Sequence, residues 1–190
     1  MAQRVKVHDL EVEYEVIHRD IQCPRLEFKT GRLQVILPRG YWNSKDLIDR
    51  HKTWIYRTAT VIQDALNESS KNKLNLERSE KEFKGLVSHF VEVFSERLGV
   101  HPNKIRFKKM KSRWGSCSSN KKIITINMHL RYLPEYIIGY VIFHELIHFL
   151  ERRHNKVFWK KISRIYPDYK DINKELLMYW YLLQDKGLLE

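Results

Sequence analysis

Cysteine is scarce in this chain of 190 residues, which contains only Cys23 and Cys117. Two cysteines so far apart form no CxxC pair, so a scaffold stapled by several disulfides and a four-cysteine zinc site are both excluded. Such sparing use of cysteine is typical of proteins in a reducing compartment, and we expect a cytoplasmic location. For Cys117 we expect a small buried side chain rather than a metal ligand or a redox switch.

Long apolar runs are missing as well. The longest, YIIGYVIF at residues 136–143, is far shorter than the roughly 20 residues that a membrane-spanning helix needs. The first residues also lack the apolar segment of a secretory signal. Seven glycines and five prolines are too few for a long disordered or collagen-like stretch. We therefore expect a folded protein without a membrane partner, and the sequence does not indicate its oligomeric state.

Acidic residues are outnumbered in this chain. It has 23 Asp and Glu residues against 35 Lys and Arg residues, which leaves a formal net charge of +12. A surface of this sign attracts polyanions, so nucleic acid is a candidate partner. The alternative is that the basic faces are only solvated, as they are in many basic proteins. Composition alone leaves both interpretations open.

The residues that are abundant suit a globular protein of one domain or two small lobes. Hydrophobic residues make up 43% of the chain and include five Trp, ten Tyr and eight Phe, which is enough to fill a core. Alternating apolar residues predict a strand over 11–19. Two more alternating runs within 26–38 flank Thr30 and Gly31, and this pattern predicts a hairpin. The first part of the chain should therefore form a sheet.

A helix is predicted to follow these strands. The pattern begins at Asn43 or Ser44 and continues to Leu66. Its apolar residues are spaced mostly by three and four positions, which indicates one buried face. The polar residues 67–78 interrupt this pattern and are the best candidate for a linker. We therefore expect an N-terminal lobe of strands and a helix over 1–78.

The remaining residues, 79–190, predict a second region of mixed structure. Ser79 and Glu82 form a capping box that begins a helix, and Gly99 is its expected C-terminal stop. The further elements predicted in chain order are a strand over 104–110, a loop over 111–122, a strand over 123–130, a helix from Pro134 to Leu150, a helix capped by Asn155 and a helix capped by Asp171. The whole chain therefore predicts an α+β fold.

Residues 144–154 read HELIHFLERRH and hold the strongest chemical signal in the sequence. On a helix His144 and His148 lie one turn apart on the same face, so both imidazoles can reach one metal ion. Glu145 is rotated by about 100° from His144, which suits a general base beside the metal rather than a ligand. The order H-E-x-x-H is typical of zinc hydrolases in which the glutamate activates a zinc-bound water. The alternative is a buried polar cluster satisfied by hydrogen bonds alone.

The third ligand has more than one candidate. His154 lies six residues after His148, which is about 240° around an unbroken helix. It reaches the metal only if the helix ends within 149–153, and no glycine or proline marks such a turn; otherwise it is an exposed surface histidine. Glu151 lies on the face of the two histidines but a turn further along, which suits support of a ligand better than ligation. Glu175, in the last predicted helix, is the remaining candidate.

Several motifs in fixed order extend this pattern beyond the histidines. They are SRWGSC (112–117), ITIN (124–127), YVIFHELIHFLERRHNKVFW (140–159) and YPDYK (166–170). Together they resemble the YgjP-like metallopeptidase family and, more distantly, the WLM and SprT-like metalloproteases. The resemblance implies a zincin-like metallopeptidase core over 79–190, with a small antiparallel sheet packed on the HExxH helix.

The same resemblance implies a ligand set. It assigns zinc to His144, His148 and His154, because this family does not carry the glycine turn of the metzincins. One departure is Gly139, where the family usually has Asp, and we expect a packing reason for a glycine inside a helix. By analogy with related metallopeptidases, the strand at 123–128 is expected to be a sheet edge that pairs with extended substrate.

Two residues of the SRWGSC motif are candidates for further roles. Arg113 is a candidate for steering an anionic group or stabilising an oxyanion, and a structural salt bridge to carboxylates of the same domain is an equal alternative. Trp114 is expected to be a core residue rather than a platform for substrate.

The leading functional hypothesis is a zinc-dependent metallopeptidase in which Glu145 activates zinc-bound water for attack on a peptide carbonyl. Its partner would be a peptide or protein, and the basic charge together with the distant similarity to SprT-like enzymes adds nucleic-acid-associated proteins as candidate substrates. A second hypothesis is a metal-dependent hydrolase of nucleotide phosphoanhydrides. A third is a non-catalytic, zinc-containing module that binds nucleic acid.

Overall fold

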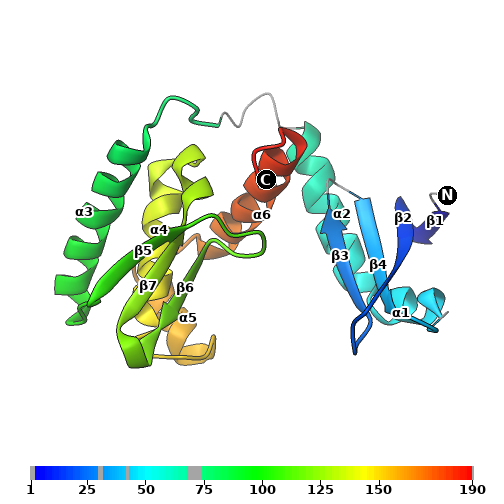
Figure 1. The fold of residues 1–190 in the computed structure, drawn as a ribbon, viewed down its shortest axis with the longest axis horizontal. Coiled ribbons are helices and arrows are strands. Elements are labelled where there is room, and N and C mark those ends of the chain that lie inside the picture. The colour runs from blue at the N-terminus through cyan, green and yellow to red at the C-terminus, as the bar shows by residue number, and fades with distance from the viewer. Residues whose placement is uncertain (1–2, 30–31, 42, 68–73, 190) are drawn as a thin grey trace. The chain divides into compact units, whose positions relative to one another are not determined.

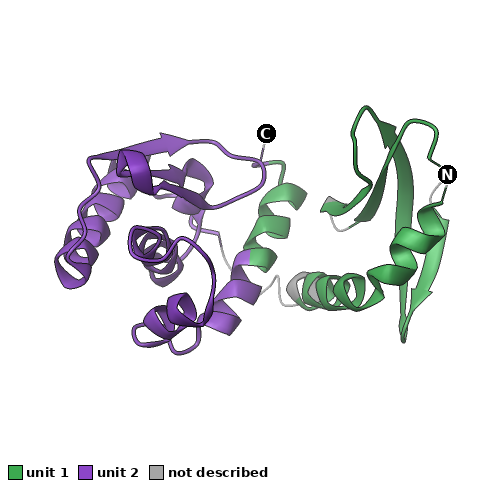
Figure 2. Ribbon diagram, turned by 90° about the horizontal axis from the view of Figure 1, so that it is seen from below, with its two compact units in different colours: residues 1–71, 177–187 green, residues 72–176, 188–190 purple. Residues whose placement is uncertain are grey.

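The computed structural model describes residues 3–29, 32–41, 43–67 and 74–189 (Figure 1). The chain divides into two compact units, Met1–Lys71 with Leu177–Gly187 and Asn72–Leu176 with Leu188–Glu190 (Figure 2). The last helix, α6 (Tyr169–Asp185), contributes residues to both units. The predicted domains, 1–78 and 79–190, remain a prediction. Within the described ranges, none of the helices combines the length and apolar character that crossing a bilayer requires.

The first unit is built on a four-stranded sheet. In spatial order its strands are β1 (Gln3–Val7), β2 (Leu10–Arg19), β4 (Arg32–Pro38) and β3 (Arg25–Lys29). β2 and β4 run parallel, whereas the other two pairs are antiparallel. The predicted strands are therefore present, and the predicted turn at residues 30 and 31 lies outside the described residues. Leu33, Val35 and Leu37 of β4 are fully buried and form the centre of this unit's core.

The helical part of the first unit differs from the prediction of a single helix. The structure has two helices, α1 (Ser44–Arg50) and α2 (Lys52–Asn67), separated at His51. His51 has a backbone outside the helical region (φ −114°, ψ 15°), and its N–H donates to the Ile48 carbonyl. Its ring nitrogen Nδ1 lies 2.8 Å from the carbonyl of Leu47. The histidine thus caps α1, a local effect that apolar periodicity does not reveal.

The second unit contains a three-stranded sheet that differs from the predicted one in two ways. Its strands, in spatial order, are β5 (Lys104–Lys108), β7 (Ile123–Asn127) and β6 (Gly115–Ser118). β5 and β7 run parallel, so the sheet is mixed rather than antiparallel. β7 lies in the middle, so the prediction that residues 123–128 form a sheet edge is wrong. The edge strands are β5 and β6. The sequence of β6, GSCS, shows no apolar alternation and was predicted as loop.

Helices cover the inner face of this sheet (Figure 1). The helices of the second unit are α3 (Glu80–Leu98), α4 (Glu135–Ile147) and α5 (Lys156–Ser163), with short 3₁₀ turns η1 (Ser119–Lys121) and η2 (Met128–Tyr132). The capping box and the left-handed Gly99 (φ 67°) of α3 are both present as predicted. α4 contacts α3, α5, β6 and β7, and all its residues from Ile137 to Phe143 are buried. The predicted α+β class is therefore confirmed, with the motif helix at the centre of this unit.

Candidate metal centre

Helix α4 carries two of the predicted ligands on one face. His144 lies in its last turn and His148 caps its C-terminus, with the two ring centroids 5.0 Å apart. Nδ1 of His148 lies 3.1 Å from the main-chain carbonyl of Glu151. Because a carbonyl can only accept a hydrogen bond, Nδ1 carries the proton, and Nε2 is left with the lone pair that a metal needs.

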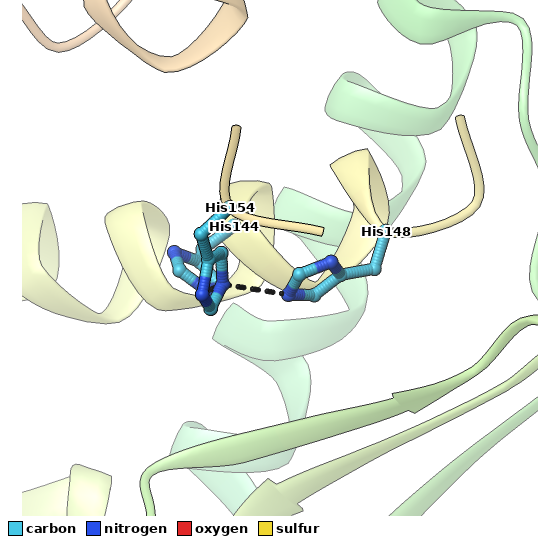
Figure 3. A group of neighbouring side chains, drawn as sticks. All are labelled: His144, His148 and His154. Atoms are coloured by element: carbon cyan, nitrogen blue, oxygen red, sulfur yellow. Dashed lines mark hydrogen bonds between the residues drawn. The ribbon is translucent and has the colours of Figure 1, made fainter. Parts of the chain in front are cut away.

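The chain turns back after α4 and brings a third histidine to the first two (Figure 3). Nε2 of His154 lies 2.9 Å from Nε2 of His144 and 3.1 Å from Nε2 of His148. The helix ends at Ile147, two residues before the predicted range 149–153. The main-chain N–H groups of residues 149–151 still donate to carbonyls of Leu146 and Ile147, so the helix tightens into a turn instead of stopping at a glycine.

The residues after His154 hold this turn in place. Asn155 caps α5, and its side chain accepts hydrogen bonds from the N–H groups of Val157 (2.9 Å) and Phe158 (3.0 Å). The ring of Phe158 is fully buried, with its centroid 4.6–4.9 Å from those of all three histidines. Trp159 Nε1 donates to the carbonyl of His154 (3.1 Å). These contacts, above all the burial of Phe158, therefore hold the turn in place without a glycine.

The three imidazoles fit a divalent metal. A tetrahedral zinc ion with bonds of about 2.0–2.1 Å holds its ligand nitrogens about 3.3 Å apart, close to the two Nε2 separations of His154. Burial and the neighbouring His148 and His154 lower the pKa of His144 to about 3. Burial, followed by His148, also lowers the pKa of His154. Both shifts favour the neutral imidazole, which is the form that binds metal, so this group can hold an ion.

The two glutamates that were alternatives for the third ligand lie elsewhere. Glu175 accepts a hydrogen bond from the Tyr136 hydroxyl. Glu151 supports His148 as expected, but it does so through its main-chain carbonyl, because the helix has already ended. Its carboxylate instead accepts from the N–H of Arg153 (3.3 Å). Neither carboxylate belongs to the histidine cluster.

Glu145 lies beside this cluster and is only 6% exposed. Burial raises the pKa of its carboxyl to about 8, and the positive charge of Arg113 opposes this shift. A carboxylate with a raised pKa is a stronger base than an ordinary one, which suits a proton acceptor working near neutral pH. Among the described residues, no other acidic side chain lines the pocket that holds the histidines.

Strand β6 passes so close to Glu145 that only glycine fits at its first position. A Cβ atom added to Gly115 would lie 2.6 Å from Oε1 of Glu145 and 2.7 Å from its Cγ. Such distances are too short for any real side chain, so the strand can approach the carboxylate only because residue 115 has none. The SRWGSC motif thus contributes its glycine to the site, a role that spacing in the sequence did not predict.

A buried asparagine fixes the loop that leads into β6. Nδ2 of Asn127 donates to the carbonyls of Met110 (2.9 Å) and Arg113 (2.8 Å). Its Oδ1 accepts from the N–H groups of Met110 (3.3 Å) and His129 (3.1 Å). The ITIN and SRWGSC motifs are therefore linked directly, and sequence reasoning assigned no role to this asparagine.

The histidines and Glu145 lie in an open pocket of about 800 Å³. Arg113 and Arg152 both line it, and Arg152 donates to the side chain of Asn120 (2.6 Å). Arg113 is exposed, and its charge acts on Glu145.

Trp114, expected in the core, is half-buried and forms part of the wall of this pocket. Further lining comes from hydroxyl side chains, Ser112, Ser116, Ser118 and Ser119, of which Ser119 donates to the carbonyl of His148 (2.8 Å).

Cys117 lines the same pocket, is half-buried, and should be a slow nucleophile. Burial raises the pKa of its thiol, and the nearby Glu145 adds to the shift. Less thiolate is therefore present at a given pH than in an ordinary cysteine, whereas Cys23 is exposed to the reagent. At about pH 8 we expect iodoacetamide to modify Cys117 in a Cys23→Ser variant several times more slowly than Cys23 in a Cys117→Ser variant. Mass spectrometry measures the two modification rates, and equal rates would contradict this expectation.

Gly139 has the packing reason that its place in a helix predicts. An added Cβ would lie 2.9 Å from the hydroxyl oxygen of Tyr166 and 3.1 Å from the ring of Phe90. The aspartate that the family usually has there does not fit this packing. In this chain the space is filled by aromatic side chains instead.

The chain was compared with known proteins. A family model described as "YgjP-like, metallopeptidase domain" matches residues 60–178. Two similar solved structures are the metallopeptidase zymogens of Pyrococcus abyssi abylysin and Methanocaldococcus jannaschii jannalysin. Abylysin has 23% identity, covers 48% of this chain and 91% of its own, and has a TM-score of 0.44. For jannalysin the values are 24%, 50%, 96% and 0.44. No curated protein matches the chain.

Proposed function

The chain belongs to the YgjP-like metallopeptidase domain family, and from this premise we propose that it is a zinc-dependent peptidase. Its metal would be held by His144, His148 and His154. The observation that carries the proposal is the convergence of three imidazole nitrogens beside the buried carboxyl of Glu145, on an open pocket. Three protein ligands leave a fourth position open, as catalytic rather than structural zinc sites do.

The roles of the side chains follow from this arrangement. Zinc held by the three histidines would supply a Lewis acid for the carbonyl and for the attacking water. Glu145 accepts the proton that the attacking water gives up as its oxygen bonds to the carbonyl carbon, and returns it to the amine when the C–N bond breaks. Arg113 contributes positive charge at the pocket, which stabilises the oxyanion of the tetrahedral intermediate.

Strand β6 is the proposed binding edge for an extended peptide. It is an edge strand of its sheet, it lines the pocket, and its first residue lies against Glu145. A peptide added alongside β6 would place a carbonyl near the histidines while main-chain hydrogen bonds hold it in register. This assignment replaces β7, which is paired on both sides.

A substrate assay tests the proposed function. The zinc-loaded protein is incubated with denatured casein, and separately with nucleoside triphosphates, before and after a chelator removes the metal. We expect casein fragments only from the zinc-loaded protein. A Glu145→Gln preparation made in parallel serves as the control for contaminating proteases. Release of phosphate or pyrophosphate without any casein cleavage would overturn the peptidase proposal.

A second candidate is hydrolysis of a nucleotide phosphoanhydride. The observation that favours it is the pocket lining, where Arg113, Arg152 and several serine hydroxyls accompany one buried carboxyl. Arginine and hydroxyl groups bind phosphate oxygens well. The same assay separates the two candidates, because each predicts a different product from the same zinc-loaded sample.

A further inference from the structure

The positive charge of the chain is concentrated in one stretch. The 38 residues from Arg97 to Pro134 contain ten Lys and Arg residues and no Asp or Glu. Ten of the twelve net positive charges therefore come from a fifth of the chain. This stretch contains all three strands of the second unit's sheet. The charge is thus a property of one part of the molecule rather than of its whole surface.

Strand β5 places part of this charge on one face. Lys104, Arg106 and Lys108 alternate along the strand and are exposed. Ile105 and Phe107 point the other way, and the ring of Phe107 packs edge-on against that of Phe83 in α3 (centroids 6.0 Å apart). Residues two apart on a strand are about 6.6 Å apart. The strand therefore presents a regular row of three cations on the outer face of the sheet.

A groove of about 760 Å³ runs along this row. Arg106, Thr125 and Ser116 are paired across the three strands, so two hydroxyl groups continue the row that begins at Arg106. The groove is also lined by three further exposed cations, Lys109, Lys111 and Arg113, and by no acidic residue of the described part of the chain. Its described lining therefore combines cations with hydroxyl donors.

The cations of this groove are not neutralised within the described chain. None of the six takes part in an ion pair between described residues. Other cations of the same unit are paired: Arg78 with Glu135 (3.5 Å) and Arg131 with Glu80 (3.6 Å). The groove therefore keeps its charge available for an external anion.

We propose that this groove binds the phosphodiester backbone of a nucleic acid. Regularly spaced lysine and arginine with serine and threonine hydroxyls are the side chains that contact phosphate oxygens in such complexes. The aromatic lining residue, Phe107, packs against Phe83 and cannot stack on a base, so binding should be independent of base sequence and strongly dependent on salt.

This inference does not rest on the proposed hydrolysis, because binding is measured without turnover. The groove does share Ser112, Arg113 and Ser116 with the pocket of the histidines. If the proposed peptidase function also holds, proteins bound to the same nucleic acid would be presented beside the metal centre. The substrate class would then be nucleic-acid-associated proteins.

The test measures binding of a short labelled oligonucleotide of mixed sequence, as single strand and duplex, to the full chain between about 50 and 200 mM salt. A labelled poly-glutamate peptide of equal charge is the second probe. The triple variant Lys104→Gln, Arg106→Gln, Lys108→Gln is compared with the control triple Arg19→Gln, Arg39→Gln, Lys81→Gln. The control positions are exposed and the loss of charge is the same.

We expect the β5 triple variant to bind the single strand about tenfold or more weakly at about 150 mM salt, with a log–log salt slope shallower by about two. The control triple should retain its affinity within about twofold. If the β5 triple does not fold, the single variants Lys104→Gln and Lys108→Gln should each reduce the slope by about 0.7. Equal losses in both triples, or poly-glutamate binding as tightly as the oligonucleotide, would overturn the proposal.

Discussion

Replacing Glu145 with glutamine is expected to lower peptide hydrolysis by about 10²–10⁴-fold while the zinc content stays unchanged. Glutamine has nearly the same shape, so it can occupy the buried space that Gly115 leaves against the side chain. It cannot accept a proton from water, and it lies beside the three imidazoles rather than among them. The rate should therefore fall through loss of the base and not through loss of the metal. Elemental analysis and casein cleavage on the same samples measure the two effects separately.

Glu135→Gln is the matched control for this variant. Glu135 lies in the first turn of the same helix, is exposed, and pairs only loosely with Arg78 (3.5 Å). The same chemical change there should leave both zinc content and hydrolysis near wild-type values. Full activity in Glu145→Gln would show that the carboxylate is not the base. If neither the wild type nor either variant cleaved casein while all three retained zinc, the protein would be better described as a zinc-containing binding module, the third hypothesis drawn from its sequence.

Replacing His154 with alanine is expected to abolish stable zinc binding. The variant removes one of three converging nitrogens, and two remaining imidazoles are a poor site for a metal that prefers at least three protein ligands. Ligand binding stabilises a folded protein by about 2.7 kcal/mol at a concentration 100 times the Kd. Added zinc should therefore raise the melting temperature of the wild type and have little effect on His154→Ala.

Two further variants make this result specific to His154. Glu175→Ala removes the other candidate for the third ligand and should keep the zinc-dependent rise, because its carboxylate is bound to the Tyr136 hydroxyl. His101→Ala removes an exposed histidine outside the cluster and should also keep it. Loss of zinc in Glu175→Ala with retention in His154→Ala would reverse the assignment.

Features that depend on neighbours in the chain were predictable from the sequence. The capping box of Ser79 and Glu82, the stop at Gly99 and the placement of His144 and His148 on one helical face all follow from local geometry. The predicted strands of the first unit also appear, because each alternates over a run long enough to be recognised. Strand β6 is present but was not predicted, because its four small and polar residues show no such alternation.

The sequence by itself therefore determined the helix, two of its histidines and the position of Glu145, since a helical repeat relates residues only a few positions apart. The tertiary structure alone decided where that helix ends and that His154 returns to it. The end is set by the burial of Phe158 under the three imidazoles and by the Asn155 cap, and not by a glycine. It also decided that β7 is central and that β6 crosses Glu145 at Gly115, because strand order and close approach depend on contacts between residues far apart in the chain.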